Sequence, residues 1–329
     1  MSARAARRTL GTLGGLLAVG ATGVAYAYAE TKLFTVRHVA VPVLPAGQAD
    51  IRVLHISDLH VTPTQRRKLA WVRSLADLRP DLVVDTGDNL AHRDAVGPLL
   101  EALEPLLATT PGVYVMGSND YWAPMLKNPA HYLRADPRAH RATPTPLPWE
   151  RLTAGFAAAG WKDLDNRRDT VALADGRSLT FVGTDDPHLD LDEMPTRPAD
   201  TGLTGVTSGS AATGTDQAAA LHVGVTHAPY RRILDGFRAD GAELILAGHT
   251  HGGQLRLPGF GAIVTNCDLD RRRASGLHGW PGTRPDTPGG AGSVWLHVSA
   301  GAGTSPYTPV RFACRPEATL LTLTARFSS

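Results

Sequence analysis

Residues 51–60 read IRVLHISDLH, an apolar run that ends in a polar turn carrying Asp58 and His60. The same pattern returns four times, in LVVDTGDN (82–89), VYVMGSND (113–120), LHVGVTH (221–227) and LILAGHTHGG (244–253). Each short apolar run is typical of a buried strand. Strand ends of this kind can converge at one edge of a sheet, where loops carry function. We therefore expect the polar residues that follow these runs to lie close together.

The residues at the five strand ends are of types that bind divalent metal ions. They are Asp58, His60, Asp88, Asn119, His227, His249 and His251. A pair of hard or borderline ions takes a mixed shell of oxygen and imidazole nitrogen and needs no cysteine. In the pairs Asp58-x-His60 and His249-x-His251, the middle residue of an extended segment points away, so both members can face one cavity. One such pair alone would carry little weight, but five ordered segments predict a two-metal hydrolase.

Hydrolysis at phosphorus would explain why these ligand types occur together. One carboxylate has to bridge two cations about 3.5–4 Å apart, so that a shared hydroxide can attack phosphorus while both ions offset the developing charge. Asp88 is the candidate for this bridge, and we count it among the catalytic residues.

At these residues the chain resembles the calcineurin-like metallophosphoesterases, whose pattern is D-x-H, GD, GNH-D/E, a lone His and GH-x-H. The resemblance covers roughly residues 51 to 325. It implies a metal-dependent phosphoesterase with two divalent ions (Mn, Fe or Zn), and a four-layer α/β/β/α sandwich of two mixed β-sheets flanked by helices. It also divides the ligands into two sets that share Asp88: Asp58, His60 and His251 for one ion, and His227 and His249 for the other.

One segment departs from the family pattern. Where the family has Gly-Asn-His-Asp, this chain has Gly117-Ser118-Asn119-Asp120. Either the turn slips by one residue and Asn119 still reaches a metal, or Ser118 coordinates through its hydroxyl. In both cases the histidine that assists the leaving group is absent, and general-acid help is worth about 10²–10⁴-fold. The chain then either prefers a good leaving group, as in a pyrophosphate or nucleotide, or uses another acid.

Three further residues are candidates for the site. His188, in the turn after the strand at 179–183, is the candidate replacement acid, and a loop histidine without a role is the alternative. Tyr121 and Trp122 directly follow Asp120, so they could wall a substrate pocket or simply pack within their loop.

The rest of the chain fits one large domain, residues 48–327, since 43% of the chain is hydrophobic and 19% charged. Apolar residues at helical spacing predict helices over 69–78, 96–107 and 149–159. Strands near 294–299 and 319–323 come closer together, as in a mixed sheet with hairpins. Loops are predicted at 123–148, 190–217 and 268–292, of which 190–217, rich in Gly, Thr, Ser and Ala, reads as a flexible insertion.

Residues 1–30 form a separate segment. Arg4, Arg7 and Arg8 precede residues 9–29, an uncharged stretch long enough to cross a bilayer as a transmembrane helix. The basic flank should stay cytoplasmic, which places the catalytic domain outside the cytoplasm. A retained single-pass signal anchor in the cell membrane fits this pattern. A signal peptide cleaved on export fits as well, since small residues recur at cleavage spacing between Ala25 and Ala29.

Net charge and cysteine content indicate which partners and which covalent links the chain can have. The net charge is only +2, so the broad basic footprint of a nucleic-acid-binding protein is missing and no nucleic acid is expected. Cys267 and Cys314 could pair in an oxidising compartment or stay free.

The expected function is hydrolysis of a phosphate ester or pyrophosphate in a phosphorylated small molecule or a lipid-linked envelope substrate. A nucleotide or cyclic nucleotide phosphodiesterase is the alternative within the class. A non-catalytic metal-binding or scaffold protein of the same fold is the alternative outside it.

Overall fold

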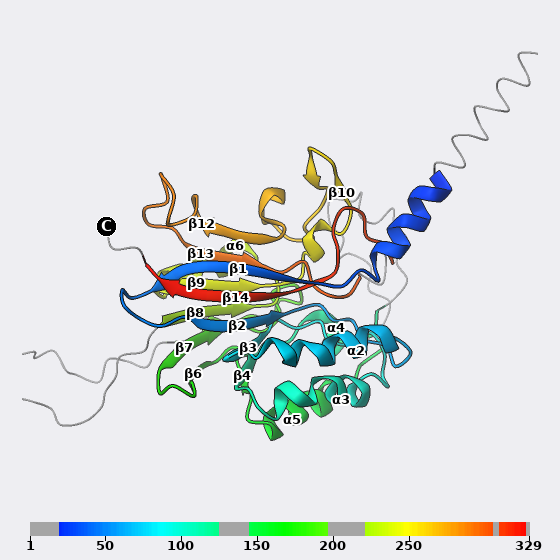
Figure 1. The fold of residues 1–329 in the computed structure, drawn as a ribbon, viewed down its shortest axis with the longest axis horizontal. Helices are drawn as coiled ribbons and strands as arrows, with labels where there is room; N and C mark the ends of the chain where they lie inside the picture. Colours follow the sequence, from blue (N-terminus) through cyan, green and yellow to red (C-terminus); the bar gives the residue numbers. More distant parts are fainter. Residues whose placement is uncertain (1–19, 125–144, 197–220, 305–308, 327–329) are drawn as a thin grey trace, which may run out of the picture.

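The computed structural model describes residues 20–124, 145–196, 221–304 and 309–326. Two six-stranded mixed sheets face each other, with helices on their outer sides (Figure 1). The first sheet contains, in spatial order, β1 (Thr35–Leu44), β14 (Glu317–Ala325), β2 (Ile51–Ile56), β3 (Leu82–Asp85), β4 (Gly112–Tyr114) and β5 (Lys162–Asp163). The second contains β12 (Gly276–Trp280), β13 (Val294–Val298), β9 (Leu244–Ala247), β8 (Leu221–Thr226), β7 (Ser178–Gly183) and β6 (Arg168–Ala172).

The five runs that end in candidate ligands are β2, β3, β4, β8 and β9. Within the first sheet β2, β3 and β4 are parallel, and within the second β8 and β9 are parallel. All five runs are almost completely buried, as expected for strands covered on both faces. We call the edge of the sandwich at which they end the carboxyl edge.

Three buried apolar clusters hold the layers together. On the first sheet, α2 (Arg66–Ser74), η1 (Leu75–Leu78), α3 (Val96–Leu107) and α5 (Trp149–Ala158) pack their apolar stripes against the outer face. A second cluster fills the space between the sheets, and in a third α6 (Arg231–Ala239) packs Leu234 and Phe237 on the other outer face. Each such large apolar side chain contributes about 1.5–3 kcal/mol when fully buried. The predicted helices and the two mixed sheets are therefore present, in the order helix, sheet, sheet, helix.

Among the strands that were not predicted, two extend the ends of the large sheets. β1 lies upstream of residue 48 and pairs in parallel with β14 along its whole length, so the sheet begins earlier than the expected domain start. Residues 268–292, predicted as a loop, contain η4 (Arg271–Arg273) and the strand β12, which pairs antiparallel with β13. β12 reads GLHGW, with two glycines, so it becomes a strand only because β13 supplies its hydrogen bonds. Residues 125–144 and 197–217 of the other two predicted loops lie outside the described residues.

The amino-terminal segment is joined to the fold. Residues 20–30 are helical and end at Glu30, which is only 1% exposed. Its carboxylate accepts hydrogen bonds from the backbone N–H groups of Ala313 (3.0 Å) and Cys314 (2.7 Å), and Arg311 N–H donates to Ala27 O (2.9 Å). The sequence had indicated no contribution of this segment to the fold, and these contacts correct that expectation. Residues 1–19 of the predicted anchor lie outside the described residues. Among the helices described, none is long and apolar enough to cross a membrane.

Candidate metal centre

The seven candidate ligands meet at the carboxyl edge, and six of them are buried, Asn119 being half-buried. Five have a backbone φ in the left-handed region, between 42° and 67°: Asp58, His60, Asp88, His249 and His251. The described residues include eleven non-glycine positions of this kind, so nearly half of them fall in this one site. Such backbone costs of order 1–3 kcal/mol per residue and persists where the surroundings impose it. Strain concentrated on five candidate metal ligands points to a functional constraint.

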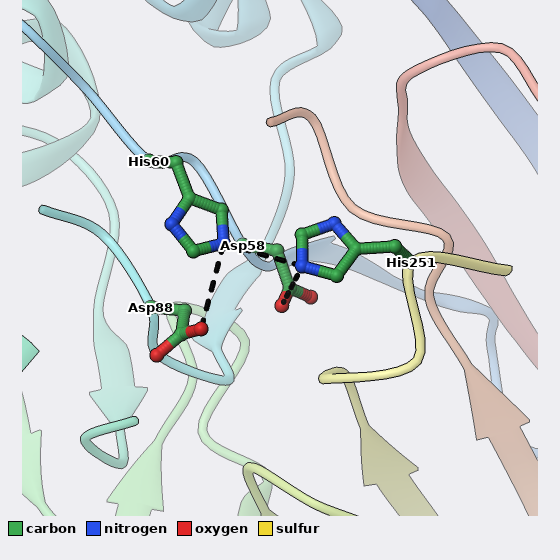
Figure 2. Close-up of side chains that lie close together, drawn as sticks. All are labelled: Asp58, His60, Asp88 and His251. Atoms are coloured by element: carbon green, nitrogen blue, oxygen red, sulfur yellow. Dashed lines mark hydrogen bonds and ion pairs between the residues drawn. The ribbon is translucent and has the colours of Figure 1, made fainter. Parts of the chain in front are cut away.

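Four side chains form a first group, drawn in Figure 2. His60 Nε2 lies 3.2 Å from His251 Nε2 and 3.4 Å from Asp88 Oδ2. His251 Nε2 lies 3.5 Å from Asp58 Oδ1. Two ligand atoms that each stand about 2.1 Å from one tetrahedral ion are about 3.4 Å apart. The first group is therefore spaced to share a divalent ion.

Asp58 presents one oxygen to this group and has the other tied to the protein. Its Oδ2 accepts hydrogen bonds from Ser57 Oγ (2.5 Å) and from the backbone N–H of His249 (3.1 Å). Its Oδ1 is buried without a hydrogen-bond partner among the described residues. Burial, and then the nearby Asp88 carboxylate, raise the pKa of Asp58 well above its ordinary value. A buried, unpartnered carboxylate oxygen is costly unless a cation compensates it, so the donor set fits a metal.

His227 and His249 form a second group. His227 Nδ1 lies 2.7 Å from Thr86 O, and His249 Nε2 lies 3.2 Å from Asn266 O. A carbonyl can only accept, so each of these nitrogens carries the proton and donates it. Burial lowers the pKa of both imidazoles to about 4, so both rings are neutral at pH 7.

The two remaining nitrogens of this second group face each other. His227 Nε2 and His249 Nδ1 are 3.3 Å apart, and each has only a lone pair to offer. Two lone pairs cannot form a hydrogen bond, whereas a cation between them satisfies both. Asp88 Oδ1 lies 3.6 Å from His227 Nε2, so Asp88 turns one oxygen to each group.

Asn119 contacts the same carboxylate. Its backbone N–H donates to Asp88 Oδ1 and its side-chain amide to Asp88 Oδ2, both at 2.7 Å. Ser118 Oγ lies behind it, 3.4 Å from the amide nitrogen. Of the two residues left open by the sequence, Asn119 is thus the one whose side chain touches Asp88, and its role as a metal ligand stays a prediction. Gly117 is required here, because a Cβ at this position would stand 2.4 Å from Asp88 Oδ1.

Asp120 has a role that the sequence analysis did not assign. Its buried carboxylate accepts hydrogen bonds from four backbone N–H groups at 2.8–3.2 Å, those of Asp88, Asn89, Leu90 and Gly117. It therefore fixes the turn that carries Asp88 to the turn that carries Asn119. The acidic residue that closes the GSND segment was the available signal.

His188 also lies at the centre. Its ring centroid is 4.7 Å from that of His249, and its Nδ1 is 3.1 Å from the Tyr230 hydroxyl. Tyr121 donates its hydroxyl to Asp185 (2.8 Å) and packs edge-on against Trp149, while Trp122 is 37% exposed. The acid role of His188 and the substrate contacts of Tyr121 and Trp122 stay predictions.

Arg311 holds in place the backbone loops that pack next to the first group. This fully buried guanidinium donates to the carbonyls of Ala300 (2.7 Å), Gly301 (3.0 Å) and Cys314 (3.2 Å). The loop whose carbonyls it binds packs closely against Asp58, since a Cβ at Gly301 would stand 2.5 Å from Asp58 Cβ. The sequence offered no signal for this arginine, because its burial follows from packing alone.

Lys68 is a second support that the sequence did not reveal. It lies on α2 and donates to the carbonyls of Leu59 (2.6 Å) and His60 (3.2 Å), and burial lowers its pKa to about 7. Cys267 and Cys314 are both free, so no disulfide joins the described loops around the centre.

The chain has relatives over nearly its full length. It is 26% identical over 338 residues to an uncharacterized metallophosphoesterase, YkuE, of Bacillus subtilis (strain 168), with 96% of each protein covered. It is 25% identical over 281 residues to the uncharacterized protein YpbG of the same organism, covering 84% of this chain and 82% of that one. Among solved structures, TT1561 of Thermus thermophilus aligns with 77% of this chain and 91% of its own at 10% identity, with a TM-score of 0.37, too low to support an inference.

A family model described as calcineurin-like phosphoesterase matches residues 51–253. This match begins with β2 and ends just after His251, so it contains all seven candidate ligands, and it covers more than half of the chain. The buried Asp and His cluster is able to hold a divalent metal, as members of such a family require. The chain belongs to the calcineurin-like phosphoesterases, a family of hydrolases that act on phosphate esters.

Proposed function

We propose that the chain hydrolyses phosphate ester or pyrophosphate bonds with two divalent metal ions, of Mn, Fe or Zn. One ion is assigned to Asp58, His60 and His251, the other to His227 and His249, with Asp88 shared. The observation that carries the proposal is the pair of imidazoles whose tautomers are fixed by Thr86 O and Asn266 O, leaving two lone pairs 3.3 Å apart. Two lone pairs at this distance repel each other, and a second cation would satisfy both.

When bound, such ions would supply Lewis acidity at a phosphoryl oxygen and a nucleophilic water at neutral pH. The chain's own residues have separate tasks. Asp88 turns one oxygen to each group of ligands, and Asp120 holds its turn in place. Asn119 holds the Asp88 carboxylate and cannot deliver a proton as an imidazolium can. His188, oriented by Tyr230, is the group that we assign to protonate the leaving group.

The test is a metal-resolved activity screen. The chain is stripped of metal and reconstituted with Mn, Fe or Zn, then assayed on p-nitrophenyl phosphate, bis-p-nitrophenyl phosphate and a pyrophosphate. We expect turnover with about two metals per chain. Stoichiometric metal binding without turnover on any substrate would instead assign the chain to the non-catalytic, scaffold alternative.

One observation favours a substrate with a good leaving group. Asn119, an amide, contacts Asp88 where the family motif has an imidazole next to its amide ligand. A pyrophosphate or a nucleotide diester needs less help from a general acid than a simple alkyl ester does. We therefore place a lipid-linked pyrophosphate of the cell envelope first and a nucleotide or cyclic nucleotide diester second. Comparing rates on leaving groups of different pKa separates these from poor-leaving-group monoesters.

We further propose that the catalytic domain lies outside the cytoplasm. Support comes from the uncharged residues 9–29 behind Arg4, Arg7 and Arg8. The segment is either retained in the cell membrane as a single-pass anchor or cleaved on export.

A further inference from the structure

A group of exposed apolar side chains lies on the segment that follows His251. The strands β10 (Arg256–Leu257) and β11 (Gly261–Ala262) pair antiparallel as a short hairpin. On it and directly after it, four large apolar residues are between 41% and 58% exposed: Leu257, Phe260, Ile263 and Val264. We call these four residues the hairpin face. Apolar residues clustered on a protruding hairpin mark an interaction surface rather than ordinary exposure.

Basic side chains border the hairpin face. The Arg271 guanidinium lies over the Phe260 ring, 4.5 Å from its centroid. Arg271 and Arg272 are both exposed, and within the described parts of the chain no carboxylate pairs with either. Between them and the hairpin lies a hollow of about 540 Å³, lined by Leu257, Phe260, Arg271 and Arg272 among others. Apolar residues rimmed by such arginines have the composition that binds an anionic lipid surface.

The amino-terminal helix is continuous with this surface. The Tyr26 ring packs edge-on against Phe312 at 5.7 Å. Phe312 in turn exchanges backbone hydrogen bonds with the strand entering the hairpin, donating to Gln254 O and accepting from Arg256 N, both at 3.0 Å. The helix exposes Val24 (65%) and Tyr28 (58%) and follows the uncharged residues 9–19. In Figure 1 the helix extends toward the upper right of the view and the hairpin at β10 projects upward.

We propose that the hairpin face, with Arg271 and Arg272, seats on the surface of an anionic phospholipid bilayer. Leu257 and Phe260 then lie at the boundary of the acyl chains and the two arginines at the phosphates. Because the hairpin leaves the centre only five residues after His251, seating turns the metal centre toward molecules held in that surface. Only this last step rests on the proposed hydrolysis. The seating itself does not depend on turnover.

The first test uses the full chain reconstituted in vesicles of phosphatidylcholine with phosphatidylglycerol. A single environment-sensitive fluorophore is attached to Leu257→Cys, with the half-exposed Cys267 replaced by Ser and the buried Cys314 retained. The control places the same label at Ala46→Cys, exposed in the turn between β1 and β2 at the opposite edge. We expect a blue-shifted emission at position 257 that acyl-chain quenchers reduce, and neither effect at position 46. Equal, water-like emission at both positions overturns the proposal.

A second test measures how much the positive charge of Arg272 contributes to binding an anionic bilayer. Arg272→Gln removes a basic side chain that has no carboxylate partner among the described residues. The control, Arg52→Gln, removes a basic side chain at the start of β2, on the opposite edge of the sandwich. One basic residue near an anionic surface is worth about fivefold in binding. The label at position 257 should therefore respond to phosphatidylglycerol about fivefold less strongly in Arg272→Gln and equally in Arg52→Gln. Equal responses in both variants, or insertion that is the same in pure phosphatidylcholine, overturn the assignment to an anionic surface.

Two further measurements distinguish seating on lipid from pairing with a second copy of the chain and from the proposed hydrolysis. Disulfide-linked dimers of the Leu257→Cys chain, formed in equal yield without vesicles, would assign the hairpin face to a second copy of the chain and overturn seating on lipid. The variants should hydrolyse a soluble phosphate ester at the unmodified rate, since none is placed at the metal centre. A label that inserts in a chain without activity leaves the seating intact and removes only the proposed hydrolysis.

Discussion

Asp88 is the side chain on which both groups of ligands depend. One of its oxygens is 3.4 Å from His60 Nε2 and the other 3.6 Å from His227 Nε2. Removing a single end ligand leaves the other group intact, whereas removing this carboxylate loosens both. The turn that carries it is also the one held by Asp120, so hydrogen bonds within the protein keep this turn in place.

Asp88→Asn should abolish turnover and lower the metal content at both sites. The loss should exceed the roughly 10–100-fold typical for an outer-shell partner, because the carboxylate that we propose as a ligand to both ions is neutralised. Metal analysis and phosphoesterase rates on the same preparation measure it, with the exposed Asp94→Asn as the control. Two metals per chain at near-normal rates in Asp88→Asn would disprove the two-metal centre.

We also predict that Asn119 matters more than Ser118 for metal content and turnover. Asn119→Ala removes the amide that contacts Asp88 and should lower metal content and rate, whereas Ser118→Ala should be mild. The opposite ranking would mean that Ser118 is the ligand. Asn119→His is the gain test, because an imidazole there could supply part of the missing factor of about 10²–10⁴. Higher activity on poor leaving groups would identify position 119 as the vacant acid position.

At the scale of elements, the two sheets are joined by a buried polar contact. His55 on β2 and His297 on β13 approach through their Nδ1 atoms at 2.9 Å, and His55 Nε2 lies 3.0 Å from Thr86 Oγ1. The carbonyl of the same Thr86 orients His227. This contact therefore connects the packing of the sheets to the tautomer of a candidate ligand.

The pair gives a pH-dependent contribution to stability. Burial lowers the pKa of His297 from 6.5 to about 3. Between these pH values the unfolded chain binds a proton at this residue that the folded chain does not, so acid favours unfolding. The contribution is fully present above the unfolded pKa and falls by about 1.4 kcal/mol per pH unit as the pH drops toward the folded one.

Urea unfolding of the full chain and of His297→Gln at several pH values isolates this contribution. The variant shifts stability by a constant amount but cannot titrate, so the difference between the two chains should shrink as the pH falls from 6.5 to about 3. His38→Gln, exposed on β1, is the control. A difference that stays constant over this range would contradict the prediction.

An element could be predicted where a local sequence pattern specifies it, and could not where contacts between distant residues do. The ligand-bearing strands and the three helices have local signals, namely apolar runs that end in polar turns and stripes at helical spacing. β1 ends without a polar, ligand-bearing turn, and its place in the sheet is set by pairing with β14, about 280 residues away. The burial of Arg311 and Lys68 is likewise set by contacts that only the folded chain brings together.

For the whole molecule, the arrangement relative to the membrane is the main prediction. Arg4, Arg7 and Arg8 resist transfer, so the domain after Glu30 should be extracytoplasmic. A reporter that is active only outside the cytoplasm, fused after residue 329, should give signal, and protease added to spheroplasts should degrade the domain. A protected domain, or signal only from a cytoplasm-specific reporter, would overturn this orientation.

Two truncations separate the anchor from the fold. Deleting residues 2–19 keeps Ala27 and Glu30 with their contacts to the loop at 311–314, so metal binding should persist. Deleting residues 2–30 exposes the backbone N–H groups of Ala313 and Cys314, whose loop packs on His251, and should lower both stability and metal content. Thermal melts and metal analysis compare the two. Equal behaviour of both truncations would show that the helix is dispensable.

The place of β14 has a consequence for how the protein matures in the cell. This strand is made last, yet it lies between β1 and β2, which are made first, and it pairs with both. While the ribosome is still at work, the strand that leads to Asp58 and His60 has one of its two edges open. The candidate ligands on β2 therefore reach their final surroundings only after β14 has been synthesised and paired, and a nonsense mutation just before Glu317 would leave every candidate ligand encoded but β2 without this neighbour.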